Sequence, residues 1–191
     1  MRIVELDPQD IDRRRQAAAL LVDGFKDTGS TSWPDLDSGL KDVAESLQEN
    51  KIALTAVDDS GIVLGWIGGI RKYDGFTWEL HPLVVKDGFR NQGIGRALVA
   101  SLEDRVKEAG GITMYLGTDD ENFRTSVSGK DLYPNVLENL LGIKNPGRHP
   151  YEFYQKVGFT IVGAIPDANG WGKPDIFMAK RVGRRPAHAD G

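Results

Sequence analysis

The chain has 191 residues, a formal net charge of −4, 40% hydrophobic residues and 27% charged residues, which suits one domain with a hydrophobic core. Without cysteine it has no disulfide, thiolate metal site or cysteine nucleophile. It shows neither an apolar run of ~20 residues nor a signal-peptide core, and its charge disfavours nucleic acid, so we expect a cytoplasmic protein without a membrane or nucleic-acid partner.

The order of the apolar patterns indicates the fold class. Helical spacing is found near residues 11–22, 40–49, 93–109, 136–143 and 149–156. Strand-like runs are found at residues 2–6, 51–58, 62–71, 76–86, 112–117, 159–165 and 175–180. We therefore predict an α/β (α+β) fold in which a mixed sheet carries helices on its faces. A single domain over 1–182 should be followed by an exposed tail over 183–191.

The run Trp78–Val85 is a strand with a break in it. Alternation is expected to place Glu79, His81 and Leu83 on one face and Trp78 on the other. Pro82 cannot donate a hydrogen bond to a neighbouring strand, which predicts a local gap or bulge, or else an edge strand.

A short loop and a helix follow this strand. Gly93 and Gly95 have no Cβ atoms, so a ligand can approach the backbone closely. The free N–H groups of the first helical turn suit a phosphate or pyrophosphate, and Arg90 and Arg96 can add charge. An ordinary tight turn would look the same, so the motif does not decide by itself. It is not a P-loop, because no Gly-Lys-Ser/Thr follows, and it lacks the third glycine of a dinucleotide fingerprint.

Several longer stretches resemble one family. Arg-x-x-Gly-x-Gly over 90–95 is similar to the acetyl-CoA pyrophosphate loop of the GNAT N-acetyltransferases, and 154–159 is similar to their Tyr-x-Lys-x-Gly-Phe motif. Further matches to the aminoglycoside 6′-N-acetyltransferases, and to their chromosomal, dimeric subgroup, lie at residues 78–85, 110–113, 115–120, 149–154 and 173–180. The resemblance covers about residues 50–182, and mainly Trp33-Pro34 extends it toward the N-terminus.

The resemblance implies a GNAT fold, whose sheet splays at the fourth strand, and a homodimer. It implies acetyl-CoA as co-substrate and no metal, which agrees with the lack of metal-ligand spacing among the three histidines. The implied coenzyme contacts are Leu83, Val84, Val85, Arg90, Asn91, Gln92, Gly93, Ile94, Gly95, Arg96, Thr118, Asp119, Tyr154 and Lys156.

Three residues are candidates for catalysis. An alkyl amine is protonated at neutral pH, so a base is useful, and Glu79 is our candidate, with His81 to position a water or the substrate. Glu79 as a simple acceptor for a cationic substrate stays open, and Asp119 and Asp120 are rival bases. The family tyrosine that meets the departing thiolate corresponds to Tyr154. We expect a strengthening hydrogen bond there, because full proton donation is uphill.

An acidic insertion over 119–150 is either a wall for a polycationic sugar or a solvated loop. The expected substrate contacts are Trp33, Tyr73, Glu79, His81, Asp119, Asp120, Glu138 and Asp175. One departure from the family is visible, because many members have asparagine seven residues before the tyrosine, where this chain has Gly147.

These features predict acetyl-CoA-dependent acetylation of the 6′-amine of aminoglycosides, by direct transfer in a ternary complex. Two alternatives remain. One is acetylation of another cationic amine, such as a polyamine or a basic peptide, and the other is a non-catalytic acyl-CoA-binding module.

Overall fold

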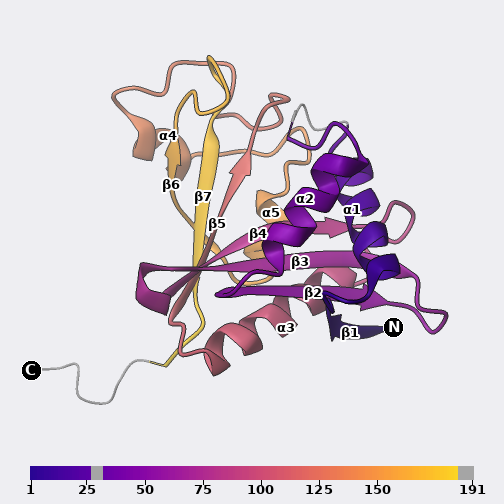
Figure 1. Ribbon diagram of the computed structural model, residues 1–191. Helices are drawn as coiled ribbons and strands as arrows, with labels where there is room; N and C mark the ends of the chain where they lie inside the picture. Colours follow the sequence, from indigo (N-terminus) through magenta and orange to yellow (C-terminus); the bar gives the residue numbers. More distant parts are fainter. Residues whose placement is uncertain (27–31, 185–191) are drawn as a thin grey trace, which may run out of the picture. The chain divides into compact units, whose positions relative to one another are not determined.

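The computed structural model describes residues 1–26 and 32–184, which form two compact units (Figure 1). Unit 1 contains residues 1–25, 32–114 and 181 onward, and unit 2 contains Lys26 and residues 115–180. Each unit combines strands and helices, which confirms the predicted α/β class. No helix among the described residues is long and apolar enough to cross a membrane.

The strands of unit 1 pair antiparallel in the order β1-β2-β3-β4. Their bounds are β1 Arg2–Glu5, β2 Lys51–Val57, β3 Val63–Lys72 and β4 Thr77–Val85. In unit 2 the order is β5-β7-β6, with β5 Thr113–Asp119, β6 Thr160–Ile165 and β7 Asp175–Arg181. All seven predicted strands are present, with ends shifted by one or two residues.

The five predicted helices are also present. They are α1 Ile11–Phe25, α2 Leu36–Ser46, α3 Ile94–Glu108, α4 Val136–Leu141 and α5 Tyr151–Lys156. The predicted start of α2 at residue 40 is wrong. Asp35 and Ser38 form a capping box, in which the side chain of each accepts a hydrogen bond from the backbone N–H of the other, and this starts the helix four residues earlier.

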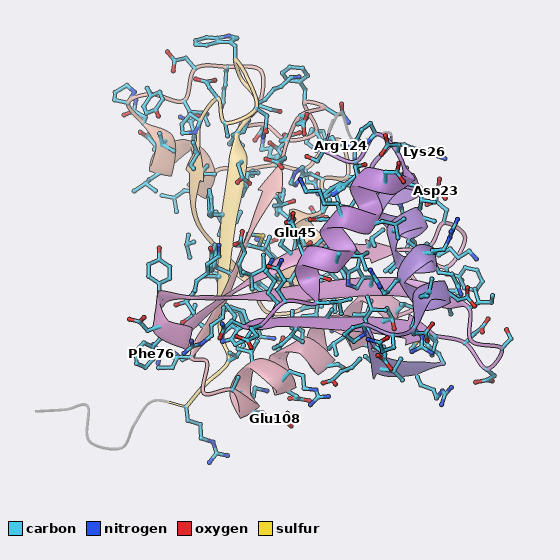
Figure 2. All side chains as sticks on the ribbon, viewed as in Figure 1. Asp23, Lys26, Glu45, Phe76, Glu108 and Arg124 are labelled. Atoms are coloured by element: carbon cyan, nitrogen blue, oxygen red, sulfur yellow. The ribbon has the colours of Figure 1, made fainter. Side chains whose placement is uncertain are left out.

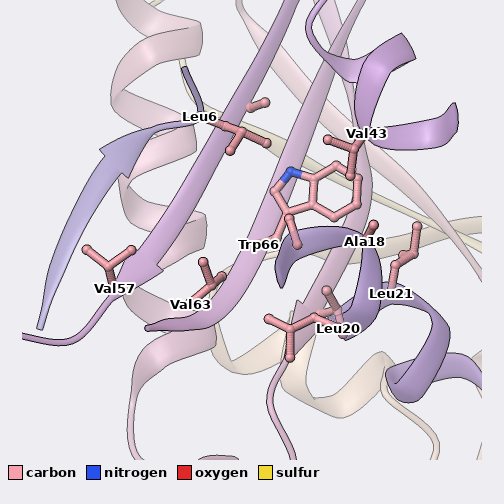
Figure 3. Close-up of a cluster of buried hydrophobic side chains, with 11 residues drawn as sticks. Leu6, Ala18, Leu20, Leu21, Val43, Val57, Val63 and Trp66 are labelled. Atoms are coloured by element: carbon pink, nitrogen blue, oxygen red, sulfur yellow. The ribbon is translucent and has the colours of Figure 1, made fainter. Parts of the chain in front are cut away.

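The main core of unit 1 lies between its sheet and the α1–α2 pair (Figure 3). Trp66 of β3 is fully buried there among Leu21 of α1, Val43 of α2 and Val57 of β2. Helix α3 packs on the opposite face, where a Cβ at Gly65 or Gly69 would meet Leu98 or Leu102. Helices therefore cover both faces of this sheet (Figure 1).

A β-bulge interrupts the pairing of β3 with β4. Pairing runs from Gly65↔Val85 to Ile67↔Leu83 and resumes at Gly69↔Leu80. Two steps along β3 correspond to three along β4, so β4 holds one extra residue at His81–Pro82. The predicted irregularity at Pro82 is confirmed on this side of the strand, and the family's splay remains a prediction.

The bulge depends on the residue that faces it. A Cβ at Gly68 would collide with the carbonyl oxygen of His81, which is a backbone atom and cannot rotate away. Only glycine fits this position without moving β4.

We predict that Gly68→Ala lowers the free energy of unfolding by about 2 kcal/mol or more, because the added methyl group displaces β4. Gly163→Ala in β6 is the control, since its Cβ would meet no atom within 4 Å, and it should change stability by less than about 0.5 kcal/mol. Urea unfolding of both variants measures the difference, and equal stabilities would contradict the steric argument.

Candidate active site

Glu79 and His81 lie on the face of the unit 1 sheet that α1 and α2 cover. Glu79 pairs with Ile70, and residues directly opposite in a pair share a face. Ile70 has the same alternation as Trp66, which packs against α1 and α2. His81 is exposed, and its ring lies 6.0 Å from that of Trp33. Three of the expected substrate contacts therefore belong to one face.

Trp33 is held by its neighbours rather than left free on its loop. Its indole N–H donates to the Asp42 carboxylate of α2 over 3.0 Å, and its ring meets Phe25 edge-on at 4.7 Å. The side chain is half-buried against the core cluster. Trp33 thus packs against the core and also lies beside His81.

Glu79 has a cationic partner that the sequence analysis did not single out. The Nζ atom of Lys72 lies 3.2 Å from its Oε2 atom, and the two side chains are 42% and 27% exposed. Lys72 ends β3 and pairs with Thr77, so Glu79 lies diagonally across the hairpin. Tyr73 follows in the connecting turn, where its side chain is 76% exposed. Phe76 closes that turn (Figure 2).

The expectation that Leu83 shares the face of Glu79 is wrong. Leu83 pairs with Ile67, which has the alternation of Gly65 and Gly69 and therefore points toward α3. The extra residue of the bulge reverses the two faces between Glu79 and Leu83. Val84 consequently belongs to the α1–α2 core, where it packs against Gly24.

The loop before α3 leaves the start of the helix open. Gly93 is the N-cap, with φ of +86°, and no side chain caps the first turn. A Cβ at Gly93 would meet no atom within 4 Å. The first N–H groups of this 15-residue helix, from Ile94, Gly95 and Arg96, thus suit an anion.

The loop is braced by its own side chains. The Arg90 guanidinium lies 3.0 Å from Asp87 and donates to the Val85 carbonyl over 3.3 Å. Gln92 donates to the Gly88 carbonyl, and Asn91 has a positive φ of +63°. Arg90 therefore supports the loop, while Arg96 is exposed at the first turn.

In unit 2, Tyr154 is half-buried on α5. Its ring meets those of Phe153 at 5.2 Å and Phe159 at 5.9 Å, both edge-on. Burial raises the pKa of the Tyr154 phenol above its usual value. The hydroxyl is therefore a weaker acid than an ordinary phenol and is suited to donating a hydrogen bond rather than its proton.

Buried His149 ties the end of β5 to the start of α5. Its Nδ1 accepts the N–H of Tyr151 over 3.2 Å, so the ring proton is on Nε2, which donates to the Asp119 carbonyl over 3.0 Å. Asn145 holds the backbone of His149 on both sides. Burial lowers the pKa of His149 below 6.5, because a charged ring would be poorly solvated there.

Asp119, the last residue of β5, and Asp120, which follows it, differ in access. Asp119 is exposed and accepts a hydrogen bond from Asn169. Asp120 is fully buried, and its carboxylate accepts from the backbone N–H of Arg124 and from both the N–H and the hydroxyl of Thr125. Burial alone would raise the pKa of Asp120, but these hydrogen bonds outweigh it and the pKa is lowered. Its oxygens are therefore engaged in holding the following loop.

The remaining expected residues of unit 2 vary in exposure. Thr118 and Asp175 are half-buried, whereas Lys156 and Glu138 are exposed. The Asp175 carboxylate lies against Gly117, where any Cβ would collide with it.

Gly147, the position where the resemblance leads to an asparagine in many GNAT enzymes, is closely packed in this structure. Its N–H donates to the Arg124 carbonyl over 2.8 Å, and a Cβ would lie 2.6 Å from the Arg124 Cα. A side chain does not fit at this point without moving the backbone.

Residues 18–126 match the model of the acetyltransferase (GNAT) family. The chain belongs to this family. Among solved structures, it is similar over 97% of its length to an aminoglycoside 6′-N-acetyltransferase complexed with coenzyme A, with 43% identity, a TM-score of 0.88 and 99% of that chain covered.

Two further structures are similar to this GNAT chain, each over 97% of its length. One is the aminoglycoside 6′-N-acetyltransferase from Enterococcus faecium, with 42% identity, a TM-score of 0.88 and 99% of that chain covered. The other is an aminoglycoside 6′-acetyltransferase type Ii, with 39% identity, a TM-score of 0.75 and 100% covered. No curated protein matches the chain.

Three residues that support the candidate residues of this GNAT enzyme, two in unit 1 and one in unit 2, were not identified from the sequence. Lys72 contacts Glu79 because of the hairpin register, and Asp42 of α2 contacts Trp33. In unit 2, buried His149 binds the Asp119 carbonyl. Opposite charges on both sides of the 73–75 turn were the only available signal for Lys72. Nothing local distinguishes Asp42 from other helix-surface carboxylates.

We predict that acidification destabilises the protein through His149. Its pKa is lowered in the folded state, so its stabilising contribution is complete above the unfolded value of about 6.5 and is lost as pH falls below it. Between pH 7.5 and 5.5 we therefore expect Tm to fall.

The variant His149→Gln cannot titrate and should show a flatter dependence of Tm on pH over this range. Differential scanning calorimetry measures both proteins. Parallel curves would exclude His149 as the source. Exposed His81 provides the control, since His81→Gln should keep the wild-type slope.

Proposed function

We propose that this GNAT enzyme transfers the acetyl group of acetyl-CoA to the 6′-amine of aminoglycosides, directly and within a ternary complex. The observation that carries the proposal is full-length similarity, at 42–43% identity, to two aminoglycoside 6′-N-acetyltransferases, one of them complexed with coenzyme A. The proposal includes a homodimer, from the resemblance to the dimeric subgroup. A cytoplasmic location stays a prediction.

The residues of unit 1 fit a CoA-type co-substrate. The uncapped first turn of α3 provides N–H donors and a positive dipole end for a pyrophosphate, and the open surface at Gly93 permits close approach. Arg96 adds charge, and the backbone of Leu83, Val84 and Val85 is assigned to the pantetheine arm. When bound, acetyl-CoA supplies the activated thioester.

Glu79 is assigned to the substrate amine. The ammonium of Lys72 beside it shows that the carboxylate accepts a primary ammonium at this position. A base there removes the proton that an alkyl amine with a pKa of ~10.4 carries at neutral pH. His81 and Trp33 are assigned to the sugar, on the same face of the sheet.

Tyr154 is assigned to the leaving thiolate as a hydrogen-bond donor. Its raised pKa makes full proton transfer to a thiolate, whose conjugate acid has a pKa near ~8.5, more uphill than for an ordinary phenol. A hydrogen bond that strengthens as charge grows on sulfur needs no such transfer.

The experiment uses two aminoglycosides that differ only at the reacting position. Neomycin carries a 6′-amine where paromomycin carries a hydroxyl. Release of CoA thiol with neomycin alone, and mass spectrometry that locates the acetyl group at N6′, would support the proposal. Equal turnover of both drugs, no turnover, or a higher kcat/KM for a polyamine or basic peptide would overturn it.

We predict that Glu79→Gln lowers kcat by about 10²-fold or more if Glu79 acts as the base. A role in binding alone would instead raise KM and leave kcat nearly unchanged. Steady-state kinetics with neomycin separate the two. Glu108→Gln, at the exposed end of α3 (Figure 2), is the control and should match the wild type.

Tyr154→Phe removes one oxygen and keeps the ring contacts with Phe153 and Phe159. We expect kcat to fall about tenfold, the size of one hydrogen bond to developing charge, with little change in Tm. If the variant lost more free energy of unfolding than of transition-state stabilisation, the residue would serve packing only.

Gly93→Ala should weaken CoA binding about tenfold, because a φ of +86° is strained for alanine and the first turn of α3 must reorganise. Gly61→Ala is the matched control, since Gly61 has φ of +87° and equally open surroundings in a hairpin turn. Calorimetric titration with CoA measures both, and equal weakening would refute a specific role for the α3 loop.

A further inference from the structure

The ion pair between Lys72 and Glu79 places a substrate-like group on the candidate base. A lysine side chain ends in a primary ammonium on a methylene carbon, and so does the 6′ position of a 6′-amino aminoglycoside. The Nζ atom of Lys72 lies 3.2 Å from the Glu79 Oε2 atom, at hydrogen-bond distance. The protein thus offers Glu79 the same donor that the proposed substrate brings.

Other groups near Glu79 do not offer this contact. Arg71 is next to Lys72 on β3, but its guanidinium donates to the Asp74 carbonyl over 2.5 Å, and its backbone position alternates to the opposite face. His81 is directed at the ring of Trp33. Lys72 is the cation that the hairpin register brings to this carboxylate.

We propose that Lys72 is an intramolecular competitor that occupies Glu79 in the free enzyme and is displaced when the substrate ammonium binds. This rests on the proposed function. Two ammonium groups at one carboxylate repel each other, so binding exchanges one for the other. Lys72 is 42% exposed at the end of its strand, and its flexible stem lets the displaced ammonium return to water.

The exchange has a consequence for affinity. Because Lys72 must leave Glu79 whichever amine binds, it lowers the affinity of every amine for the enzyme by the same factor. A ligand with a single ammonium gains little net binding free energy, because its contact with Glu79 only replaces that of Lys72. A polycation gains more, because it adds contacts elsewhere. Lys72 therefore sets the concentration at which amines begin to occupy Glu79.

The test replaces the charged side chain of Lys72 with an uncharged, unbranched side chain of similar length. In Lys72→Met, kcat/KM for neomycin should rise about three- to tenfold, the range for loss of a half-exposed ion pair together with one nearby like charge. The gain should come from KM, with kcat within about twofold. The Lys72→Arg variant keeps the ion pair, and its KM for neomycin should stay near or above that of the wild type.

A matched control separates the pair from net charge. Lys107 lies 3.2 Å from Asp104 on α3 and is 44% exposed, which closely resembles the Lys72 pair. Lys107→Met changes net charge equally and should leave kcat/KM unchanged. An equal rise in both methionine variants would overturn the proposal.

A second substrate separates local exchange from long-range repulsion. The monoamine 6-amino-6-deoxyglucose should gain the same factor from Lys72→Met as neomycin does, because only one contact is exchanged. A gain for neomycin alone would indicate repulsion of a polycation by net charge and would refute exchange.

Nuclear magnetic resonance of lysine ammonium groups reads the displacement without turnover. Neomycin should move the Lys72 signal to the position it has in Glu79→Gln and leave the Lys107 signal in place. If neomycin is acetylated while the Lys72 signal stays, the exchange is wrong and the proposed function stands. If neomycin neither binds nor reacts, the proposed function fails and the exchange fails with it.

Discussion

The candidate site of unit 1 depends on one steric constraint, the close approach of Gly68 to the His81 carbonyl. This approach accommodates the extra residue of β4, and the extra residue reverses which side chains face α1 and α2. Glu79 therefore lies on the α1–α2 side of the sheet, while Leu83, four residues later, points toward α3. Without the bulge, Leu83 would follow Glu79 onto the same face and Val84 would leave the core.

The carboxylates of Asp120 in unit 2 and of Asp42 and Glu79 in unit 1 have separate tasks that depend on burial and partners. Asp120 is fully buried, and its pKa is lowered by backbone and hydroxyl donors, so it organises a loop. Asp42 orients the Trp33 indole. Glu79 is half-buried and pairs with the partly exposed, flexible side chain of Lys72, which makes it the carboxylate best suited to exchange partners with a substrate.

Unit 2 uses buried polar contacts to place its aromatic donor. His149 in its neutral form connects the end of β5 with the start of α5, the helix that carries Tyr154. Phe153 and Phe159 then hold the phenol ring, and burial raises the pKa of its hydroxyl above the usual value. The packing that stabilises this ring thus also makes its hydroxyl a weaker acid, which can donate a hydrogen bond but gives up its proton less readily.

The sequence alone predicted the elements, because apolar periodicity and glycine or proline positions are local properties. It predicted the helix start at Gly93 and the irregular strand at Pro82, and it offered Glu79 and His81 as candidates. The choice of Trp33 and Tyr154 followed from the family resemblance. Residues 185–191 of the expected tail lie outside the described residues. The extent of α2 was missed because apolar spacing alone did not show where its capping box begins.

The tertiary structure decided the partners. The face of Leu83 depends on how β3 and β4 are paired, the contact of Lys72 with Glu79 depends on the hairpin register, and the engagement of Asp120 depends on a loop that folds back on it. Each of these joins residues through backbone geometry that no local pattern records. A one-residue change in strand pairing moves a side chain to the other face, so sequence spacing predicted the candidate base, and the fold determined its partner.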